Sequence, residues 1–489
     1  MPKPKVLLRF DTEDYITPES NDALNAILDI LDELQIKATF VLVGHKIEML
    51  LNEGETEILE KLQHHALGYH SYMHSFHPLA CEYLERLGWR EGVEKFLKVE
   101  EPGHKTFVEI FDQTPVCYTQ PGADWVPHTY VALQQWEIPF FFSEDKHSLI
   151  NLQQKPFILN GILTLAKKPT ISNLTCLASS PDTLNNARNK FYQDYQQTSQ
   201  AKEPGLIILV SHPGRMITSK KSWDVLNFAK GINTPRKKWQ TPPLKSRIEY
   251  EQDLQAFKQF LIDLMDNYDF EWITAKNLVD MYKNRIIHKD RVKGAYHGES
   301  NLTVDSNTIQ QIATAFIKEI SYYQLGDMWL SPIQATSILC HFLQIKAKEG
   351  YFPDSVPVPG EIFFPEDIPE VKVSNDLECL GWAELIQGTE TIMKMIKTDT
   401  SFPLKIKAGG NLWIELEKFI GGLAQAIITM TKDNLTLDRV LLPHTRLKTK
   451  DFVKKIDQVH WSWPIFEFGY RNGKILEYTK LLSWTMKPI

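Results

Sequence analysis

Short apolar runs alternate with helical patterns over residues 4–284 of the chain. Residues 6–10 are apolar except for Arg9, a pattern typical of a strand that is buried on both faces of a parallel sheet. Residues 23–34 then place apolar side chains at helical spacing behind the N-cap sequence Ser20-Asn-Asp. Further strands are predicted at residues 38–43, just before Tyr69, and at residues 116–118, 139–142, 206–210 and 270–274, and further helices at residues 55–64, 104–112, 129–136, 180–197, 250–265 and 275–282. Repeated βα units of this kind predict an α/β fold with a parallel sheet or barrel.

The alternation ends near residue 284, where the pattern of the chain changes. Residues 285–301 are polar and charged without periodicity, which predicts a linker. Residues 302–489 are predicted to form a mainly α accessory domain, so we expect a barrel domain over residues 1–284 followed by this second domain. Residues 330–343 with the following Ser355-Val-Pro-Val-Pro resemble residues 412–427 with the following Arg439-Val-Leu-Leu-Pro, which suggests degenerate repeats.

The composition is that of an ordinary globular protein. The chain has 489 residues, too many for one ordinary core, and is 43% hydrophobic and 24% charged. A net charge of -7 argues against broad binding to nucleic acid. The five cysteines are far apart and form no CxxC pair, so we expect neither a disulfide framework nor a thiolate zinc site. There is no run of about 18 apolar residues and no apolar stretch before the first strand, so we expect no membrane span, no signal peptide and a cytoplasmic location.

Acidic residues and histidines directly follow several of the predicted strands. They are Asp11, Glu13 and Asp14, His70 and His74, and His212. In a barrel of parallel strands such positions converge on one face, where side chains can act together. His70 and His74, spaced i and i+4, would point the same way from a helical turn and could bind one cation. His212 could serve as an acid or a base. Taken singly, these residues could instead be a solvated turn, surface histidines and a strand-boundary residue.

Together and in this order, the segments resemble the motifs of the NodB-homology polysaccharide deacetylases. The matching segments are Phe10-Asp11-Thr-Glu13-Asp14, His70-Ser-Tyr-Met-His74, Thr119-Gln-Pro121-Gly122 and Leu209-Val-Ser-His212, and residues 36–43 resemble the second strand of that family. The resemblance covers about residues 4–284. It implies a distorted (β/α) barrel and a hydrolase that acts on carbon–nitrogen bonds other than peptide bonds.

The resemblance also implies roles for single residues. Asp11 would be the general base and His212 the general acid that protonates the departing nitrogen. His70 and His74 would bind one divalent metal ion, with zinc as the first expectation and cobalt, nickel or iron as alternatives. Either Glu13 or Asp14 would supply the carboxylate ligand, and the sequence leaves both open.

The third motif departs from the family pattern, because Thr119 stands where the family has an arginine that orients the catalytic aspartate. Arg9 and Asp11 are two residues apart on a strand, so their side chains leave the same face. A guanidinium there would keep Asp11 ionised and oriented, and Arg215 is a second candidate for this task. Otherwise the lost arginine would mean an inactive site.

The predicted function is therefore metal-dependent removal of an N-acyl group, with acetyl as the first expectation, from an amino sugar or glycan. Two alternatives stay open: a catalytically impaired carbohydrate-binding protein and an amidase for a small cyclic amide. Candidate substrate-binding residues are Pro121, Gly122, Trp125, Trp223 and Arg236, and Trp125 could either stack on a sugar ring or pack on the barrel rim. We expect a carbohydrate or small amide as the partner, without nucleic acid. Residues 403–428 resemble cell-wall-binding repeats of the pseudomurein-binding kind; the alternative is an accessory domain that forms a homo-oligomer.

Overall fold

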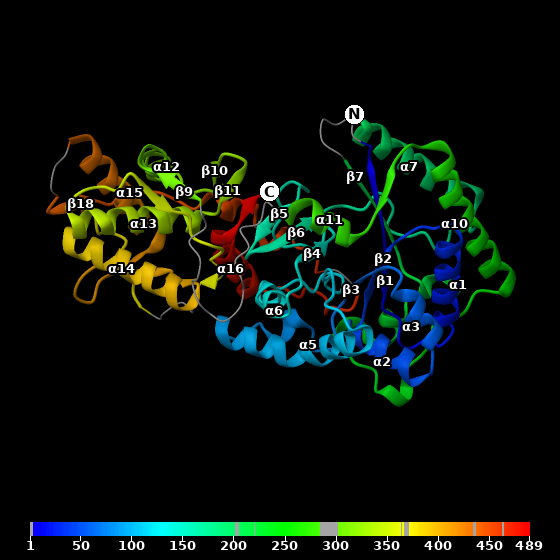
Figure 1. The fold of residues 1–489 in the computed structure, drawn as a ribbon. Helices are drawn as coiled ribbons and strands as arrows, with labels where there is room; N and C mark the ends of the chain where they lie inside the picture. Colours follow the sequence, from blue (N-terminus) through cyan, green and yellow to red (C-terminus); the bar gives the residue numbers. More distant parts are fainter. Residues whose placement is uncertain are drawn as a thin grey trace.

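The chain folds into a barrel with a smaller helical region beside it (Figure 1). The computed structural model describes residues 3–200, 205–219, 221–283, 302–362, 364–365, 371–433, 437–461 and 464–489. The predicted linker, residues 285–301, lies outside the described residues.

Strand β1 (Lys5–Thr12) is the centre of the barrel sheet. It pairs in parallel with β2 (Thr39–Leu42), β7 (Leu206–Ser211) and β8 (Glu271–Ile273), and β2 pairs in parallel with β3 (Ala66–Tyr69). The side chains of residues 6–8 are fully buried, as the apolar run predicts for a strand covered on both faces. Parallel pairing brings the carboxyl ends of these strands to one edge, where the acidic residues and histidines follow.

The sheet closes into a distorted barrel. Beyond β3, Tyr118 bridges to Tyr69 and to Phe141 of β4 (Phe140–Ser143), and β4 pairs in parallel with β6 (Ile162–Ala166). Ile171 then bridges back to β7. The predicted fold class is confirmed, although the strand expected at residues 116–118 is reduced to these two bridges of Tyr118.

Helices cover the outside of the barrel at every predicted place, and α2 (Gly44–Asn52) is an additional helix that was not predicted. The predicted ones are α1 (Ser20–Glu33), α3 (Thr56–Leu62), α5 (Trp89–Phe111), α6 (Thr129–Gln135), α7 (Pro181–Ser199), α10 (Arg247–Asn267) and α11 (Ala275–Tyr282). Helix α5 begins 15 residues before the predicted start at residue 104, because its buried face continues across Pro102, which reads as a helix breaker in the sequence. None of the helices among the described residues is long and apolar enough to cross a membrane.

The helical region contains two units with the same order of elements. The first unit is β9 (Thr303–Asp305), α12 (Ser306–Lys318), the hairpin of β10 (Tyr323–Leu325) and β11 (Met328–Leu330), α13 (Pro332–Glu349) and β12 (Ser355–Pro357). The second is β14 (Cys379–Gly381), α14 (Trp382–Asp399), the hairpin of β16 (Lys405–Lys407) and β17 (Trp413–Glu415), α15 (Leu416–Asp433) and β18 (Arg439–Leu441). In each unit the last strand pairs antiparallel with the first. The two segments that resemble each other in sequence fall on α13 with β12 and on α15 with β18.

The end of the chain returns to the barrel, which differs from the predicted domain of residues 302–489. Strand β19 (Lys487–Pro488) pairs with β5 (Phe157–Leu159), and α16 (Gly473–Leu482) lies between the helical region and the barrel (Figure 1). Ten apolar side chains from residues 453–486 share one buried cluster with Tyr69 and Phe141 of the barrel. Most of the helical region has its own core over residues 304–447, joined by Trp484. We call residues 453–461 and 464–489 the C-terminal segment.

Candidate metal centre and catalytic cavity

Strand β1 places a guanidinium directly against a carboxylate. The Nε atom of Arg9 lies 2.8 Å from Oδ1 of Asp11, and Nη2 donates to Oδ2 over 3.0 Å. Both side chains are buried, and the guanidinium also lies over the ring of Phe142 at 4.7 Å. The two-pronged contact fixes the plane of the Asp11 carboxylate. Arg9 thus gives Asp11 a guanidinium contact that Thr119 cannot give.

Glu13 and two histidines form a compact group whose side-chain atoms could bind a metal ion. The Nε2 atom of His74 lies 2.8 Å from Oε2 of Glu13, and Nε2 of His70 lies 3.7 Å from the same oxygen. One ligand atom from each of the three residues lies within 4.8 Å of the others. Burial alone would raise the pKa of Glu13, but the imidazoles of His74 and His212 hold it well below its usual range.

Hydrogen bonds on the far side of each imidazole aim both Nε2 atoms at Glu13. Nδ1 of His70 lies 2.7 Å from the carbonyl oxygen of Thr119, which only accepts, so Nδ1 carries the proton. Nδ1 of His74 lies 2.7 Å from Oγ of Ser75, whose hydroxyl donates to Asp224 over 3.2 Å. In this arrangement the Nε2 atom of each ring faces Glu13 and is the atom that would bind a metal ion, and a hydrogen bond on the far side holds each ring, as is usual for histidine ligands.

The two histidines do not lie on a helical turn, and that part of the prediction is wrong. Ser71 and His74 have positive φ angles of 64° and 51°, so the loop after β3 is left-handed at both residues. Within this loop the hydroxyl of Ser71 accepts from the backbone N–H of His74 over 3.1 Å. The loop, rather than a helical turn, therefore brings the two imidazoles together, with their ring centroids 5.0 Å apart.

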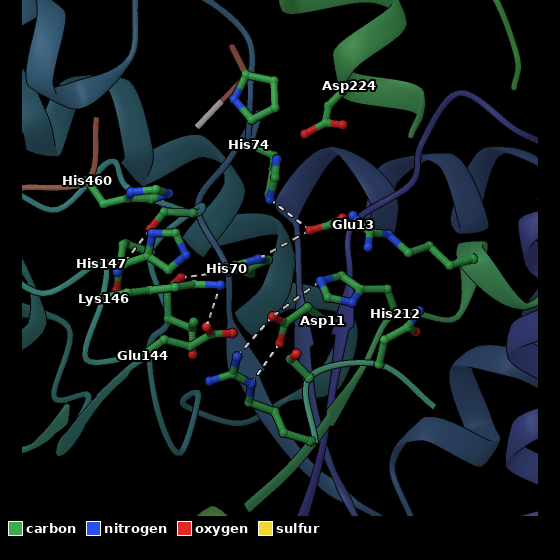
Figure 2. Close-up of a pocket in the computed structure, with 18 residues that line it drawn as sticks. Asp11, Glu13, His70, His74, Glu144, Lys146, His147, His212, Asp224 and His460 are labelled. Carbon is green, nitrogen blue, oxygen red and sulfur yellow. Dashed lines mark hydrogen bonds and ion pairs between the residues drawn. The ribbon is translucent and has the colours of Figure 1, made fainter. Parts of the chain in front are cut away.

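His212 lies at the end of β7, across the cavity floor from Asp11. Its Nε2 atom is 3.8 Å from Oδ2 of Asp11. Burial lowers the pKa of His212, while Glu13 and Asp11 act in the opposite direction. The Asp11 carboxylate and the His212 imidazole thus lie side by side, next to the group of Glu13 and the two histidines (Figure 2).

Asp14 and Arg215 do not take the roles that the sequence left open for them. The carboxylate of Asp14 accepts from the backbone N–H groups of Ile16 and Thr17 at 3.0 and 2.9 Å, so it holds the following turn rather than joining the histidines. Burial raises its pKa. Arg215 lines the cavity, but its guanidinium donates to Ser222 rather than to Asp11.

Of the five candidate substrate-binding residues, only Gly122 lines the cavity. Pro121 is buried, and Trp125 is fully buried with its ring packed against Tyr130 and Phe141, so it cannot stack on a sugar. Trp223 is also buried and packs against His74 with ring centroids 5.6 Å apart, which makes it a support for the metal group. Arg236 contacts His45 and the ring of Trp239 away from the cavity lining.

The cavity above these residues has a volume of about 330 Å³ and is lined mainly by polar side chains. Besides the predicted residues, it is lined by Gln120, Glu144, Lys146, His147, Ser172, Asn173, Asp224, His460 and Pro464. Figure 2 labels five of these residues: Glu144, Lys146, His147, Asp224 and His460. Residues 144–147 follow β4, which is a strand end like the others, so the strand-end rule alone would have suggested them. No local pattern marks residue 460, because it reaches the cavity only through the return of the chain end.

The donor set fits a divalent metal ion. Two imidazoles and one carboxylate are the ligand set of hydrolytic zinc sites, which keep a further position open for water or substrate. Both imidazoles are buried and oriented by hydrogen bonds, and the carboxylate is held in its ionised form. Glu13, His70 and His74 could therefore hold the ion.

Comparisons with known proteins agree with the sequence motifs. The family model for polysaccharide deacetylases matches residues 1–141. No curated protein matches the chain. The resemblance of residues 403–428 to cell-wall-binding repeats finds no support in these comparisons.

Solved structures show only a distant likeness. A Mycobacterium smegmatis protein assigned as a polysaccharide deacetylase is 14% identical, with 58% of this chain and 91% of that chain covered and a TM-score of 0.38. The Xyl-CE4 domain of a multidomain xylanase from the hindgut metagenome of Trinervitermes trinervoides is 15% identical over 58% and 92% of the chains, with a TM-score of 0.32. BA3943, a CE4 family pseudoenzyme from Bacillus anthracis, is 16% identical over 55% and 64%, with a TM-score of 0.31.

The family match covers the candidate metal-binding residues and Asp11, whereas His212 and the other lining residues after residue 141 lie outside it. Asp11 and Glu13 of the β1 end, and His70 and His74 of the loop after β3, all lie inside it. Residues 1–141 therefore match the polysaccharide deacetylase family, whose members are hydrolases that act on carbon–nitrogen bonds other than peptide bonds.

Proposed function

We propose that the chain is a metal-dependent deacetylase that removes an N-acetyl group from an amino sugar or glycan. The observation that carries this proposal is the arrangement of Asp11 and His212, 3.8 Å apart, beside the group of Glu13, His70 and His74. Deacetylation of a glycan agrees with the family match. The predicted cytoplasmic location stays a prediction.

Glu13, His70 and His74 are the residues that would hold the metal ion, with zinc as the first candidate and cobalt, nickel or iron as alternatives. When bound, a divalent cation polarises the amide carbonyl and makes a water molecule more acidic. Asp11 would accept the proton of the attacking water, and its contact with Arg9 keeps the carboxylate ionised and turned to the cavity. His212 in its protonated form, which the nearby Glu13 and Asp11 favour against the effect of burial, would give a proton to the departing nitrogen, which is a poor leaving group without one.

The alternatives of an impaired carbohydrate-binding protein and of a small-amide amidase make different predictions. Arg9 argues against impairment, because it gives Asp11 the guanidinium that the third motif lacks. A screen of acetylated amino sugars, chito-oligosaccharides and small cyclic amides, with metal analysis and with and without chelator, separates all three. We expect about one metal ion per chain and acetate release that chelator stops. Metal-independent turnover, or glycan binding without acetate release under any metal, would overturn the proposal.

Replacing His74 by alanine is expected to weaken metal binding by at least about 10-fold and to stop acetate release. His74 lies nearest to Glu13, and its loss removes one of three ligands. The measurement is the metal dissociation constant by competition with a chromophoric chelator. His64→Ala is the matched control, because His64 is exposed and its side chain lies near Asp32, outside the cavity. Equal metal affinity in both variants would show that His74 is not a ligand.

Replacing Arg9 by glutamine is expected to lower kcat about 10- to 100-fold, since Asp11 loses its orienting partner. Removing one partner of a buried ion pair also destabilises a protein by about 3–5 kcal/mol, so Tm is measured in parallel. In the double variant Arg9→Gln with Thr119→Arg, the arginine returns at the position where the related deacetylases have it. We expect partial recovery of kcat there, and unchanged kcat in Arg9→Gln would remove Arg9 from the site.

A further inference from the structure

The C-terminal segment is fixed to the barrel on one side of the cavity mouth. Val453 forms an antiparallel bridge with Ile150, and the backbone N–H of Lys454 donates to the carbonyl of Leu149 over 2.9 Å. The ammonium group of Lys454 donates to the carbonyl oxygens of Asp145 and Lys146 at 2.6 and 3.2 Å. These bonds hold the loop after β4, which carries three of the cavity-lining residues.

The same segment is fixed again on a second side of the cavity. The backbone N–H groups of Lys230 and Gly231 donate to the carbonyls of Pro464 and Ile465 at 3.2 and 2.7 Å. Residues 230–231 directly follow α9 (Trp223–Phe228), the helix that carries Asp224 into the cavity. Farther on, the side chains of Tyr470 and Asn472 donate to the carbonyl of Cys81 at 2.9 and 2.7 Å. The segment therefore joins two barrel loops that belong to different strand ends.

Between these two attachments the segment forms part of the cavity wall. The side chains of His460 and Pro464 are exposed to solvent and line the cavity from its outer side, and the ring centroid of His460 lies 6.2 Å from that of His147 in the loop after β4. In Figure 2 His460, His147, Lys146 and Glu144 gather on the side of the cavity away from Asp11 and His212. Burial lowers the pKa of His147 to about 3, so this ring is neutral and can share hydrogen bonds with sugar hydroxyls.

The size and polarity of the cavity limit what it can enclose. Its volume of about 330 Å³ is near the lower end of small-molecule sites, which span roughly 300–1,000 Å³. The Nζ atom of Lys146 lies 3.0 Å from Oε2 of Glu144 on the outer wall, so this pair offers both hydrogen-bond donors and an acceptor. Such a wall suits the hydroxyl groups of one neutral sugar residue better than the continuous track that a polymer needs.

We propose that the C-terminal segment closes one side of the catalytic cavity, so that the site takes a single free or chain-terminal N-acetyl amino-sugar residue rather than the interior of a polymer. This inference rests on the proposed function for the identity of the reacting group. The wall itself rests on the two attachments and on the positions of His460 and Pro464.

Two measurements on the full chain test the inference. Metal-loaded Asp11→Asn protein is titrated by calorimetry with N-acetylglucosamine and with linear chito-oligosaccharides of increasing length. We expect affinities within about 3-fold of one another, since only one residue enters the pocket. Affinity that rises with each added sugar, or no binding by any member, would overturn the inference.

The wild-type chain is then incubated with the same oligosaccharides, and the position of the lost acetyl group is found by mass spectrometry. Loss at one end alone supports the inference, and loss at interior residues overturns it. If no acetate is released while binding is independent of length, the proposed function fails but the pocket inference stands. The two failures are therefore distinguishable.

A variant of the wall gives an independent readout. His460→Ala is expected to raise KM for the shortest substrate about 5-fold with kcat little changed, because the residue contacts the non-reacting part of the sugar. Asp457→Ala is the matched control, an exposed residue three positions earlier on the same segment that does not line the cavity. Equal KM in both variants would remove His460 from the wall.

Discussion

Replacing Asp11 by asparagine is expected to lower kcat for acetate release at least about 100-fold on any substrate that the wild type deacetylates. Asparagine keeps the size of the side chain but cannot accept the proton of the attacking water. The change also leaves the buried Arg9 without its charged partner, so Tm is measured in parallel, as for Arg9→Gln. The measurement is acetate release under saturating substrate and metal.

The metal content of the variant is the control for this prediction. Asp11 is not one of the three residues whose ligand atoms cluster, so Asp11→Asn should bind as much metal as the wild type. Lost turnover with retained metal assigns Asp11 to proton transfer. Retained turnover would contradict the base assignment, and lost metal would make Asp11 a ligand instead.

The sequence predicted the barrel and the centre of the site because both depend on local patterns. A buried parallel strand leaves its next residues at one edge of the sheet, so Asp11, Glu13 and His212 could be placed together before their contacts were known. The same-face spacing of Arg9 and Asp11 on β1 likewise predicted their ion pair. The sequence alone did not show whether Glu13 or Asp14 faces the two histidines. This depends on which carboxylate accepts hydrogen bonds from the backbone of the next turn, and in the structure that carboxylate is Asp14.

Other parts of the site depend on contacts between distant parts of the chain. His460 follows the barrel strands by almost 200 residues, and nothing near it in the sequence shows that the chain returns to the cavity. Asp224 supports His74 through Ser75 across 150 residues. Trp125 was a stacking candidate because it follows a strand-end motif, but its ring turns inward to pack against Phe141. The hydrophobic pattern of a sequence does not show which distant residues a side chain will contact.

The chain that ends at residue 284 is expected not to fold, although the sequence marks this residue as the domain boundary. The C-terminal segment contributes ten buried apolar side chains to the barrel cluster: Val453, Val459, Trp461, Ile465, Phe466, Ile475, Leu476, Tyr478, Leu482 and Met486. Burial of a large apolar side chain contributes about 1.5–3 kcal/mol. Even half of the combined effect would match the total stability of about 5–15 kcal/mol of a typical domain.

The prediction is tested with two shortened chains. Residues 1–284 alone should be insoluble, or should show no cooperative thermal transition by circular dichroism. Residues 1–284 joined through a long flexible glycine–serine linker to residues 448–489 should regain a cooperative transition, because β19 and α16 can then cover the barrel again. If residues 1–284 alone unfold cooperatively near the Tm of the full chain, the barrel folds without the C-terminal segment, which then only packs against it. In that case the wall that it forms at the cavity must also be reconsidered, since its position would no longer follow from the core that it completes.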